Sequence, residues 1–139
     1  MALILIKPDN TFGEYEYKKG KDSLGVLQRL VKGNISLVNA GDNFVGYVDD
    51  EGLMKDDQGQ NELGAYVLNF LGNDLKGFVG GLVRGPLVLL RPNDRPLSDK
   101  QTAAFLKLCG HIMKHGYAEG KKIPGTAILT KTKKGFTPY

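Results

Sequence analysis

The order of the expected secondary-structure elements constrains this chain more than any other feature of its sequence. Strand-like runs come in pairs, and a helical pattern follows each of the first two pairs, so strands and helices do not alternate singly. A parallel doubly wound sheet needs a helix between successive strands, whereas strands joined by short turns pair antiparallel. We therefore predict a single α+β domain over residues 1–139, with a mainly antiparallel or mixed sheet and about three helices packed on one face.

Six runs in the sequence have the composition of β-strands. Each is rich in Leu, Ile, Val, Thr or aromatic residues and is bounded by residues that favour turns. The runs are residues 2–7, 11–17, 34–40, 43–49, 78–90 and 126–130. The turn signals Pro8-Asp9-Asn10 and Gly41-Asp42 join the first four runs into two predicted hairpins. The run at 78–90 is one bent strand or two short ones, and Pro86 belongs at an edge or a bulge of it.

Three further segments have the apolar periodicity of amphipathic helices, with residues three or four positions apart on one face. These faces are Leu24, Leu27, Leu30 and Val31; Leu63, Tyr66, Val67, Phe70 and Leu71; and Phe105, Leu108, Cys109, Ile112 and Met113. The expected N-caps are Asp22 or Ser23, then Asn61, then Ser98, which has Gln101 at the capping-box spacing. A glycine follows each helical pattern and is expected to end the helix.

Positive charge is concentrated in the last third of the chain. Residues 1–97 carry 11 basic and 13 acidic side chains, whereas residues 98–139 carry 8 basic and 2 acidic ones. We expect residues 117–139 to form a basic, partly mobile segment, in which aromatic residues suit stacking on bases and lysines suit contacts to phosphates. The nucleic-acid hypothesis selects Lys121, Lys122, Lys131, Lys133 and Lys134. A solvated lysine-rich surface is the alternative interpretation.

No motif for catalysis or metal binding has the required spacing. The acidic residues at positions 49–57 lack the glycine and glutamate positions of an EF-hand, and the glycine-rich run at 77–85 contains no P-loop or dinucleotide pattern. His111 and His115 have the spacing of two metal ligands on a helix, but no third ligand accompanies them. We predict no enzyme, no catalytic residue, no metal and no cofactor. A carboxylate pair that forms only in the folded chain stays an open alternative.

The sequence has no feature of a membrane or exported protein. Its first apolar run is six residues long and is followed by Lys7-Pro8, and no run approaches the roughly 18 residues that span a bilayer. Cys109 is the single cysteine, and it belongs to a predicted apolar helix face. We therefore expect a soluble cytoplasmic protein in which Cys109 fills the core and no membrane is bound.

The stretch from Leu27 to Leu90 contains four short motifs that resemble a known family. They are Leu27-Gln28-x-x-Val31-x-Gly33-x-Ile35, Asp50-Glu51-Gly52, Asn61-x-x-Gly64-Ala65 and Phe78-Val79-Gly80-Gly81-x-Val83. These motifs resemble a small uncharacterised domain family of bacteriophages and other mobile elements, although Gly81 stands where that family often has an acidic residue. The resemblance covers just under half of the chain. It implies a viral or mobile-element source that acts inside a bacterium, and the family has no established enzymatic activity to carry over.

Small phage proteins without catalytic motifs commonly act by occupying a host component, which is an argument by analogy. The first hypothesis is a phage-type inhibitor of a bacterial defence system, acting in the host cytoplasm, which sequesters an anionic nucleotide signal or docks on a defence protein. Its expected ligand-binding residues are Asn61, Arg84, Asp50, Glu51 and Arg91. We expect a homo-oligomer, because small domains often build ligand sites between copies. The second hypothesis is a nucleic-acid-binding accessory protein that uses the C-terminal lysines.

Overall fold

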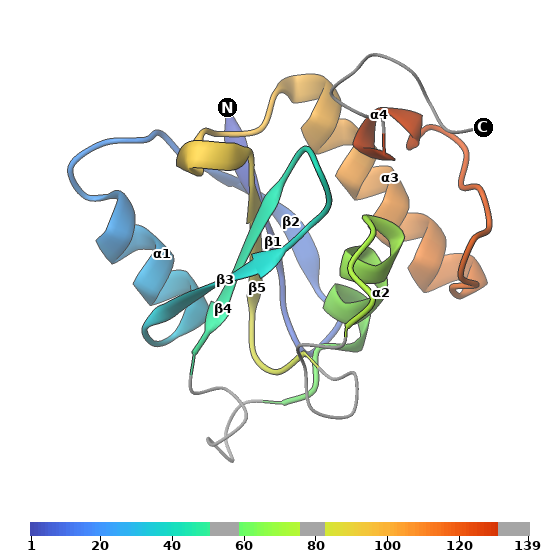
Figure 1. Cartoon of the computed structure of the whole chain (residues 1–139), viewed down its shortest axis with the longest axis horizontal. Coiled ribbons are helices and arrows are strands. Elements are labelled where there is room, and N and C mark those ends of the chain that lie inside the picture. Colours follow the sequence, from blue (N-terminus) through green and yellow to red (C-terminus); the bar gives the residue numbers. More distant parts are fainter. Residues whose placement is uncertain (51–58, 76–82, 131–139) are drawn as a thin grey trace.

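The centre of the molecule is a five-stranded antiparallel sheet with the strand order β2-β1-β5-β4-β3 (Figure 1). The computed structural model describes residues 1–50, 59–75 and 83–130. The strands are β1 (Ala2–Ile6), β2 (Phe12–Glu16), β3 (Ile35–Asn39), β4 (Val45–Asp49) and β5 (Leu87–Leu90). The helices are α1 (Ser23–Val31), α2 (Glu62–Phe70), α3 (Asp99–His115) and the short α4 (Ala127–Thr130), and η3 (Pro92–Asp94) is a 3-10 turn. The predicted α+β fold is confirmed.

Both predicted hairpins form, and β5 joins them into one sheet. β1 pairs with β2, and β3 pairs with β4. β5 inserts between the two hairpins, where Leu89 lies opposite Ile4 of β1 and Gly46 of β4. Of the strand predicted at 78–90, residues 78–82 lie outside the described part of the chain. The edge or bulge position predicted for Pro86 is wrong, because Pro86 directly precedes the central strand, before the first paired residue of β5.

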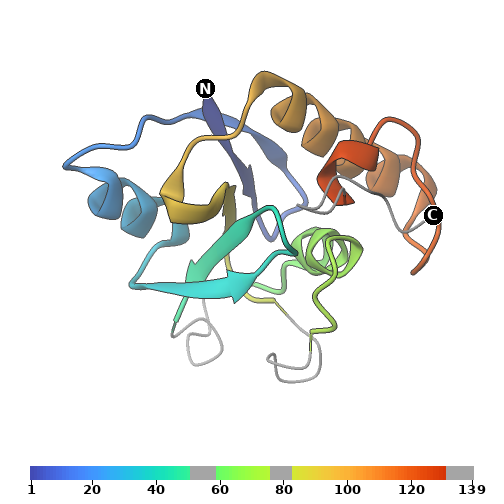
Figure 2. The same ribbon diagram turned by 45° about the horizontal axis from the view of Figure 1, so that its top comes forward.

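Helices cover both faces of the sheet, which corrects the prediction of a single helical face. Successive side chains of a strand point to opposite faces, so β1 and β5 contribute alternately to two cores. Ile4 and Leu89 pack with buried residues of α2 and α3, whereas Leu3 and Val88 pack with α1. Figures 1 and 2 show α1 on one side of the sheet and α2 with α3 on the other. All four residues of β5 are buried, as expected for a strand covered on both faces.

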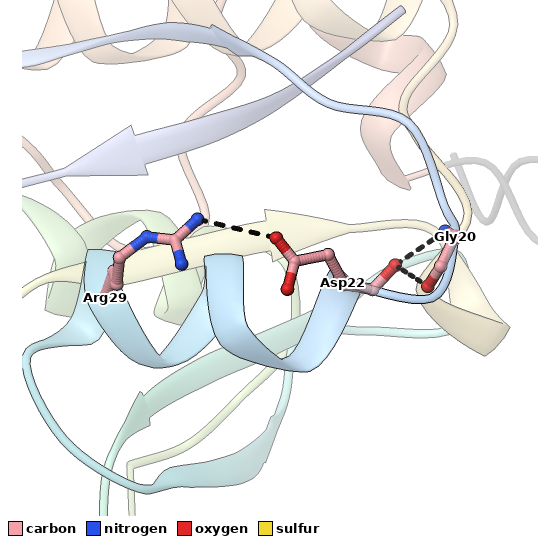
Figure 3. A network of polar contacts seen from close by, with 4 residues as sticks. Gly20, Asp22 and Arg29 are labelled. Atoms are coloured by element: carbon pink, nitrogen blue, oxygen red, sulfur yellow. Dashed lines mark hydrogen bonds and ion pairs between the residues drawn. The ribbon is translucent and has the colours of Figure 1, made fainter.

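A serine holds the first turn of α1, although Asp22 occupies the N-cap position. The Asp22 side chain makes no capping hydrogen bond. Ser23 Oγ accepts from the Gly20 N–H and donates to the Gly20 carbonyl, both at 2.8 Å, and this bonding fixes the chain entering the helix (Figure 3). The Asp22 carboxylate also lies 4.0 Å from the Arg29 guanidinium, an exposed pair that contributes little to stability.

The end of α1 differs from the prediction that Gly33 terminates the helix. Lys32 adopts the left-handed conformation at the C-cap, with φ of 64°. Gly33 is needed for a different reason, because a Cβ at this position would lie 2.5 Å from Asp49 Oδ1. Asp49 is buried in the last position of β4, within the strand predicted at 43–49. The missing side chain of Gly33 therefore makes room for a buried carboxylate.

α3 begins with the predicted capping box. The Gln101 N–H donates to Ser98 Oγ at 3.2 Å, and the Ser98 N–H donates to Gln101 Oε1 at 2.9 Å. Gly116 is the C-cap, as predicted. Met113 of α3 is 49% exposed and Leu24 of α1 is 55% exposed, so these two residues lie outside the buried faces predicted for them.

The segment predicted as a strand at 126–130 is helical, which corrects that prediction. Ala127–Thr130 form α4, one turn in length. Thr126 precedes the turn, and its hydroxyl donates to the Ile123 carbonyl at 2.7 Å while the Leu129 N–H donates to the Thr126 carbonyl at 3.0 Å. These bonds between residues three apart favour a helical turn over an extended strand.

Candidate functional site

A cavity of about 630 Å³ lies between the C-terminal end of α2, the segment 117–126 and α4. After α3 the chain reverses and runs back along the outside of the helices toward α4 (orange to red in Figure 1), and this return forms much of the cavity wall. Cavities of roughly 300–1,000 Å³ are the size of small-molecule sites in proteins. The lining includes Asn69 and Phe70 of α2, Tyr117, Glu119, Lys121 and Lys122 of the return, and Thr130 of α4.

Buried side chains anchor the return segment on the core. Ile123, Thr126 and Leu129 are buried, and Ile123 and Leu129 belong to the core shared with α2 and α3. Gly120 and Gly125 have φ of 78° and 81°, a conformation that residues with a Cβ rarely adopt. The return segment therefore has a turn at each of these two glycines and is attached to the core by its buried residues. Its exposed polar residues, Lys121 and Lys122, lie between the two turns.

Tyr117 forms a wall of the cavity in a fixed orientation. Its ring stacks on the ring of Tyr66, with centroids 5.1 Å apart and planes inclined by 22°. Its hydroxyl donates to Asn69 Oδ1, and burial, with the nearby charge of Glu119, raises the pKa of Tyr117. Tyr117 is therefore a neutral hydrogen-bond donor at physiological pH. A smaller hollow of about 240 Å³, bounded by Tyr66 and Met113, also borders Tyr117.

The charged groups of the cavity lining favour an anion. Lys121 and Lys122 are adjacent and exposed, and Glu119 is the acidic residue of the lining. The cavity lining therefore has two positively charged side chains and one negatively charged side chain. The C-terminal end of α2 carries a partial negative charge that opposes an anion, so a charged ligand group would bind beside the lysines rather than beside α2.

Asn61, one of the predicted ligand-binding residues, is a structural residue in the interior. It is 0% exposed, and its Oδ1 accepts from the Gly64 N–H at 2.8 Å as the predicted N-cap of α2. Its Nδ2 donates to the carbonyls of Ile6 at 2.8 Å and Gly85 at 2.9 Å. Every hydrogen-bonding atom of the Asn61 amide is thus used within the fold, and we do not propose that Asn61 binds a ligand.

The other predicted ligand-binding residues do not form one site. Arg84 is half-buried, and its Nε is buried without a hydrogen-bond partner. Asp50 is exposed just beyond β4, at the end of the sheet where β5 begins. Arg91 lies at the opposite end of β5, and its Nε donates to the Pro96 carbonyl at 2.6 Å. Glu51 lies outside the described residues, and Arg84, Asp50 and Arg91 are absent from the lining of the cavity beside Tyr117.

Two of the five lysines selected by the nucleic-acid hypothesis, Lys121 and Lys122, line the cavity. Lys131, Lys133 and Lys134 lie outside the described residues. Sequence reasoning missed Asn69, Phe70 and Thr130, because a cavity between distant segments leaves no local pattern. The available signal was the pair of glycines with Pro124 between Tyr117 and Thr130, which indicates a turned rather than an extended chain.

The histidines and the cysteine in the described part of the chain are absent from the cavity lining. Within residues 1–50, 59–75 and 83–130, no group of three or more His, Cys, Asp or Glu could hold a metal ion. His111 and His115 lie on α3 with ring centroids 4.7 Å apart. Burial raises the pKa of the Cys109 thiol to about 12, so very little thiolate forms at neutral pH.

Comparison with known proteins gives no relative: no family model, curated protein or solved structure matches the chain. The resemblance to the phage domain family therefore stays a prediction based on its four motifs. None of the helices in the described ranges has the length and apolar character needed to cross a bilayer.

Proposed function

We propose that this protein is a non-enzymatic binding protein that holds a small anionic ligand of nucleotide type in the cavity beside Tyr117. The observation that carries the proposal is the presence of Lys121 and Lys122 on the lining of a cavity of about 630 Å³ that also has aromatic walls. A nucleotide has a flat, largely apolar base and charged phosphates. Aromatic rings such as Tyr117 and Phe70 suit the base, and lysines suit the phosphates.

The hydroxyl groups of the lining support binding rather than catalysis. Thr126 and Thr130 donate to the carbonyls of residues three positions earlier, and Tyr117 donates to Asn69. These hydroxyls are therefore used to hold the wall in shape. Nucleophilic catalysis needs a hydroxyl or thiol activated by an adjacent base, and none of the three is paired in that way.

The proposed biological role is inhibition of a bacterial defence system by withholding its nucleotide signal. The support for this role is the resemblance of residues 27–90 to the phage domain family, together with the anion-favouring cavity. Docking on a defence protein is the other form of the same role. The two forms differ in one outcome: protection of phage in cells without nucleotide binding by the purified protein would favour docking.

Isothermal titration calorimetry with cyclic mononucleotides, cyclic dinucleotides and linear nucleoside diphosphates tests the proposal. We expect one class to bind, and the double variant Lys121→Ala/Lys122→Ala to bind at least about tenfold more weakly, since two charge-assisted contacts are lost. The matched control is Lys18→Ala/Lys21→Ala, which removes the same charge from exposed positions before α1. Absence of heat with every nucleotide, or equal weakening by both double variants, would contradict the cavity assignment.

The exposure of Lys121 and Lys122 also supports the second hypothesis, that the protein binds nucleic acid. Counterion release predicts retention of DNA or RNA on a gel that weakens steeply as salt rises. Deleting residues 131–139 should remove most of that retention if the C-terminal lysines carry it. Unchanged retention after the deletion, or no retention at low salt, would exclude this function.

A further inference from the structure

The outer edge of β3 lacks several of the features by which edge strands usually avoid pairing with other chains. β3 is the last strand of the sheet, and among the described residues no strand lies on its outer side. Its sequence, Ile-Ser-Leu-Val-Asn, contains no charge, proline or glycine, which are common protections of edge strands. Leu37, at its middle, is 63% exposed. The strand therefore combines free pairing capacity with an exposed apolar side chain.

The hydrogen bonding to β4 determines which backbone groups of β3 face outward. The Asp50 N–H donates to the Asn34 carbonyl at 2.9 Å, so Asn34 points toward β4. Bonding direction alternates along an antiparallel strand, and the N–H and carbonyl groups of Ile35, Leu37 and Asn39 therefore point away from β4. The Asn39 carbonyl accepts from Asn73 Nδ2 at 2.8 Å, which agrees with this direction. Ile35 and Leu37 are left as the outward-facing residues whose groups an added strand could pair.

We propose that the β3 strands of two copies pair antiparallel about a two-fold axis that passes beside Ser36. In this register Ile35 lies opposite the partner's Leu37, and Leu37 lies opposite the partner's Ile35, so the four outward backbone groups on each copy are all paired. The register avoids Asn39, whose carbonyl is occupied. It also covers Leu37 with an apolar side chain on the α1 side of the sheet. The two sheets become one continuous sheet, and the proposal is independent of what the cavity binds.

Charge favours a second copy as the occupant of this edge. Lys32 precedes β3 and Asp42 follows it, and both are exposed. Antiparallel pairing places the start of one β3, which follows Lys32, beside the end of the other, which precedes Asp42, so opposite charges come to the same end of the interface. The opposite edge, β2, has exposed Glu14 and Glu16, which would face like charges across a two-fold axis. Pairing of β3 with β2 would not close and would build filaments.

Engineered cysteines test both the dimer and its register. Ser36 faces the partner's Ser36 as a pair without mutual hydrogen bonds, with Cα atoms about 4.5 Å apart, which is within disulfide range. Leu37 is diagonal to the partner's Leu37, at about 7–8 Å or more, which a disulfide does not bridge. We expect Ser36→Cys to give a covalent dimer under mild oxidation and Leu37→Cys to give far less. Cys109 is fully buried and does not interfere.

Sedimentation velocity completes the test. The wild-type chain should sediment as a dimer, and Leu37→Lys as a monomer, because a lysine on each copy opposes pairing. Tyr15→Lys on β2 is the matched control and should stay dimeric, with circular dichroism showing that both variants are folded. A monomeric wild-type protein, equal cross-linking by the two cysteine variants, or dissociation by Tyr15→Lys in place of Leu37→Lys would overturn the proposal. If Leu37→Lys fails to fold, the cysteine pair still decides the matter.

Discussion

Replacement of Asn61 by alanine should be among the most destabilising single changes in the described part of the chain. The change removes three buried hydrogen bonds, to the Gly64 N–H and to the carbonyls of Ile6 and Gly85. Each buried backbone group left without a partner costs about 1–3 kcal/mol, so for three groups we expect a loss of about 3–9 kcal/mol. Domains of this size are stable by about 5–15 kcal/mol, so a loss at the lower end of this range leaves a folded but much weakened protein.

Urea unfolding followed by circular dichroism at the helix band measures the loss. Ser98→Ala is the matched control, because Ser98 caps α3 as Asn61 caps α2 but has no partner in the sheet; it should cost about 1 kcal/mol. Asn61→Asp separates the two roles of Asn61. It keeps the oxygen that caps α2 and replaces the donor by an oxygen facing two carbonyls, so it should destabilise at least as much as alanine.

Either of two results would show that the buried bonds of Asn61 do not stabilise the fold as expected. If Asn61→Asp were as stable as the wild-type protein, the bonds to Ile6 and Gly85 would contribute nothing and Asn61 would be a helix cap alone. If Asn61→Ala cost no more than Ser98→Ala, the same conclusion would follow. A weakened nucleotide affinity in a fully stable Asn61 variant would also return Asn61 to the candidate ligand-binding residues.

Two further predictions follow from buried groups. Gly33→Ala should lower the free energy of unfolding by about 1–3 kcal/mol in urea, because the new Cβ would lie 2.5 Å from Asp49 Oδ1. Gly13→Ala is the control and should be near neutral, because the space around Gly13 is open. Equal effects of the two changes would contradict the close approach at Gly33. Burial raises the pKa of Cys109 from 9.0 to about 12, so at pH 8 the folded protein should react with a disulfide reagent roughly 1,000-fold more slowly than the unfolded chain, because its thiolate is that much scarcer. A fast reaction of the native protein would show that the thiol is accessible.

Local sequence patterns predicted most of the helices and strands, but they did not predict how these elements are arranged in the sheet and around it. The two hairpins and the three longer helices follow from turn residues, apolar periodicity and, for α2 and α3, N-caps that act within a few positions. The strand order does not, because β5 inserts between hairpins that are far away in sequence. The second helical face could have been inferred from Leu87–Leu90, where every residue is apolar, since an alternating pattern is lost when both faces are covered.

The candidate site was predictable only in part. Charge selects Lys121 and Lys122, and both line the cavity together with Tyr117, the first residue of the basic segment predicted at 117–139. The sequence predicts Asn61 both as a helix N-cap, which is confirmed, and as a ligand-binding residue, because a polar residue in a short motif looks the same in either role. The prediction of a strand at 126–130 is wrong because four residues are too few to distinguish a helical from a strand period of apolar residues. The hydrogen bond from the Thr126 hydroxyl to the Ile123 carbonyl favours the helical turn.

The position of β5 late in the sequence has a consequence for how the protein folds. Residues 1–49 can form both hairpins and α1, but the two hairpins have no bonds to each other until residues 87–90 arrive between them. Until then, the edges of β1 and β4 that pair with β5 are open to mispairing. The two cores also lack the side chains that β5 contributes to each of them. We therefore expect the sheet to close only once β5 is in place, and we expect a chain that ends before residue 87 to lack a folded domain.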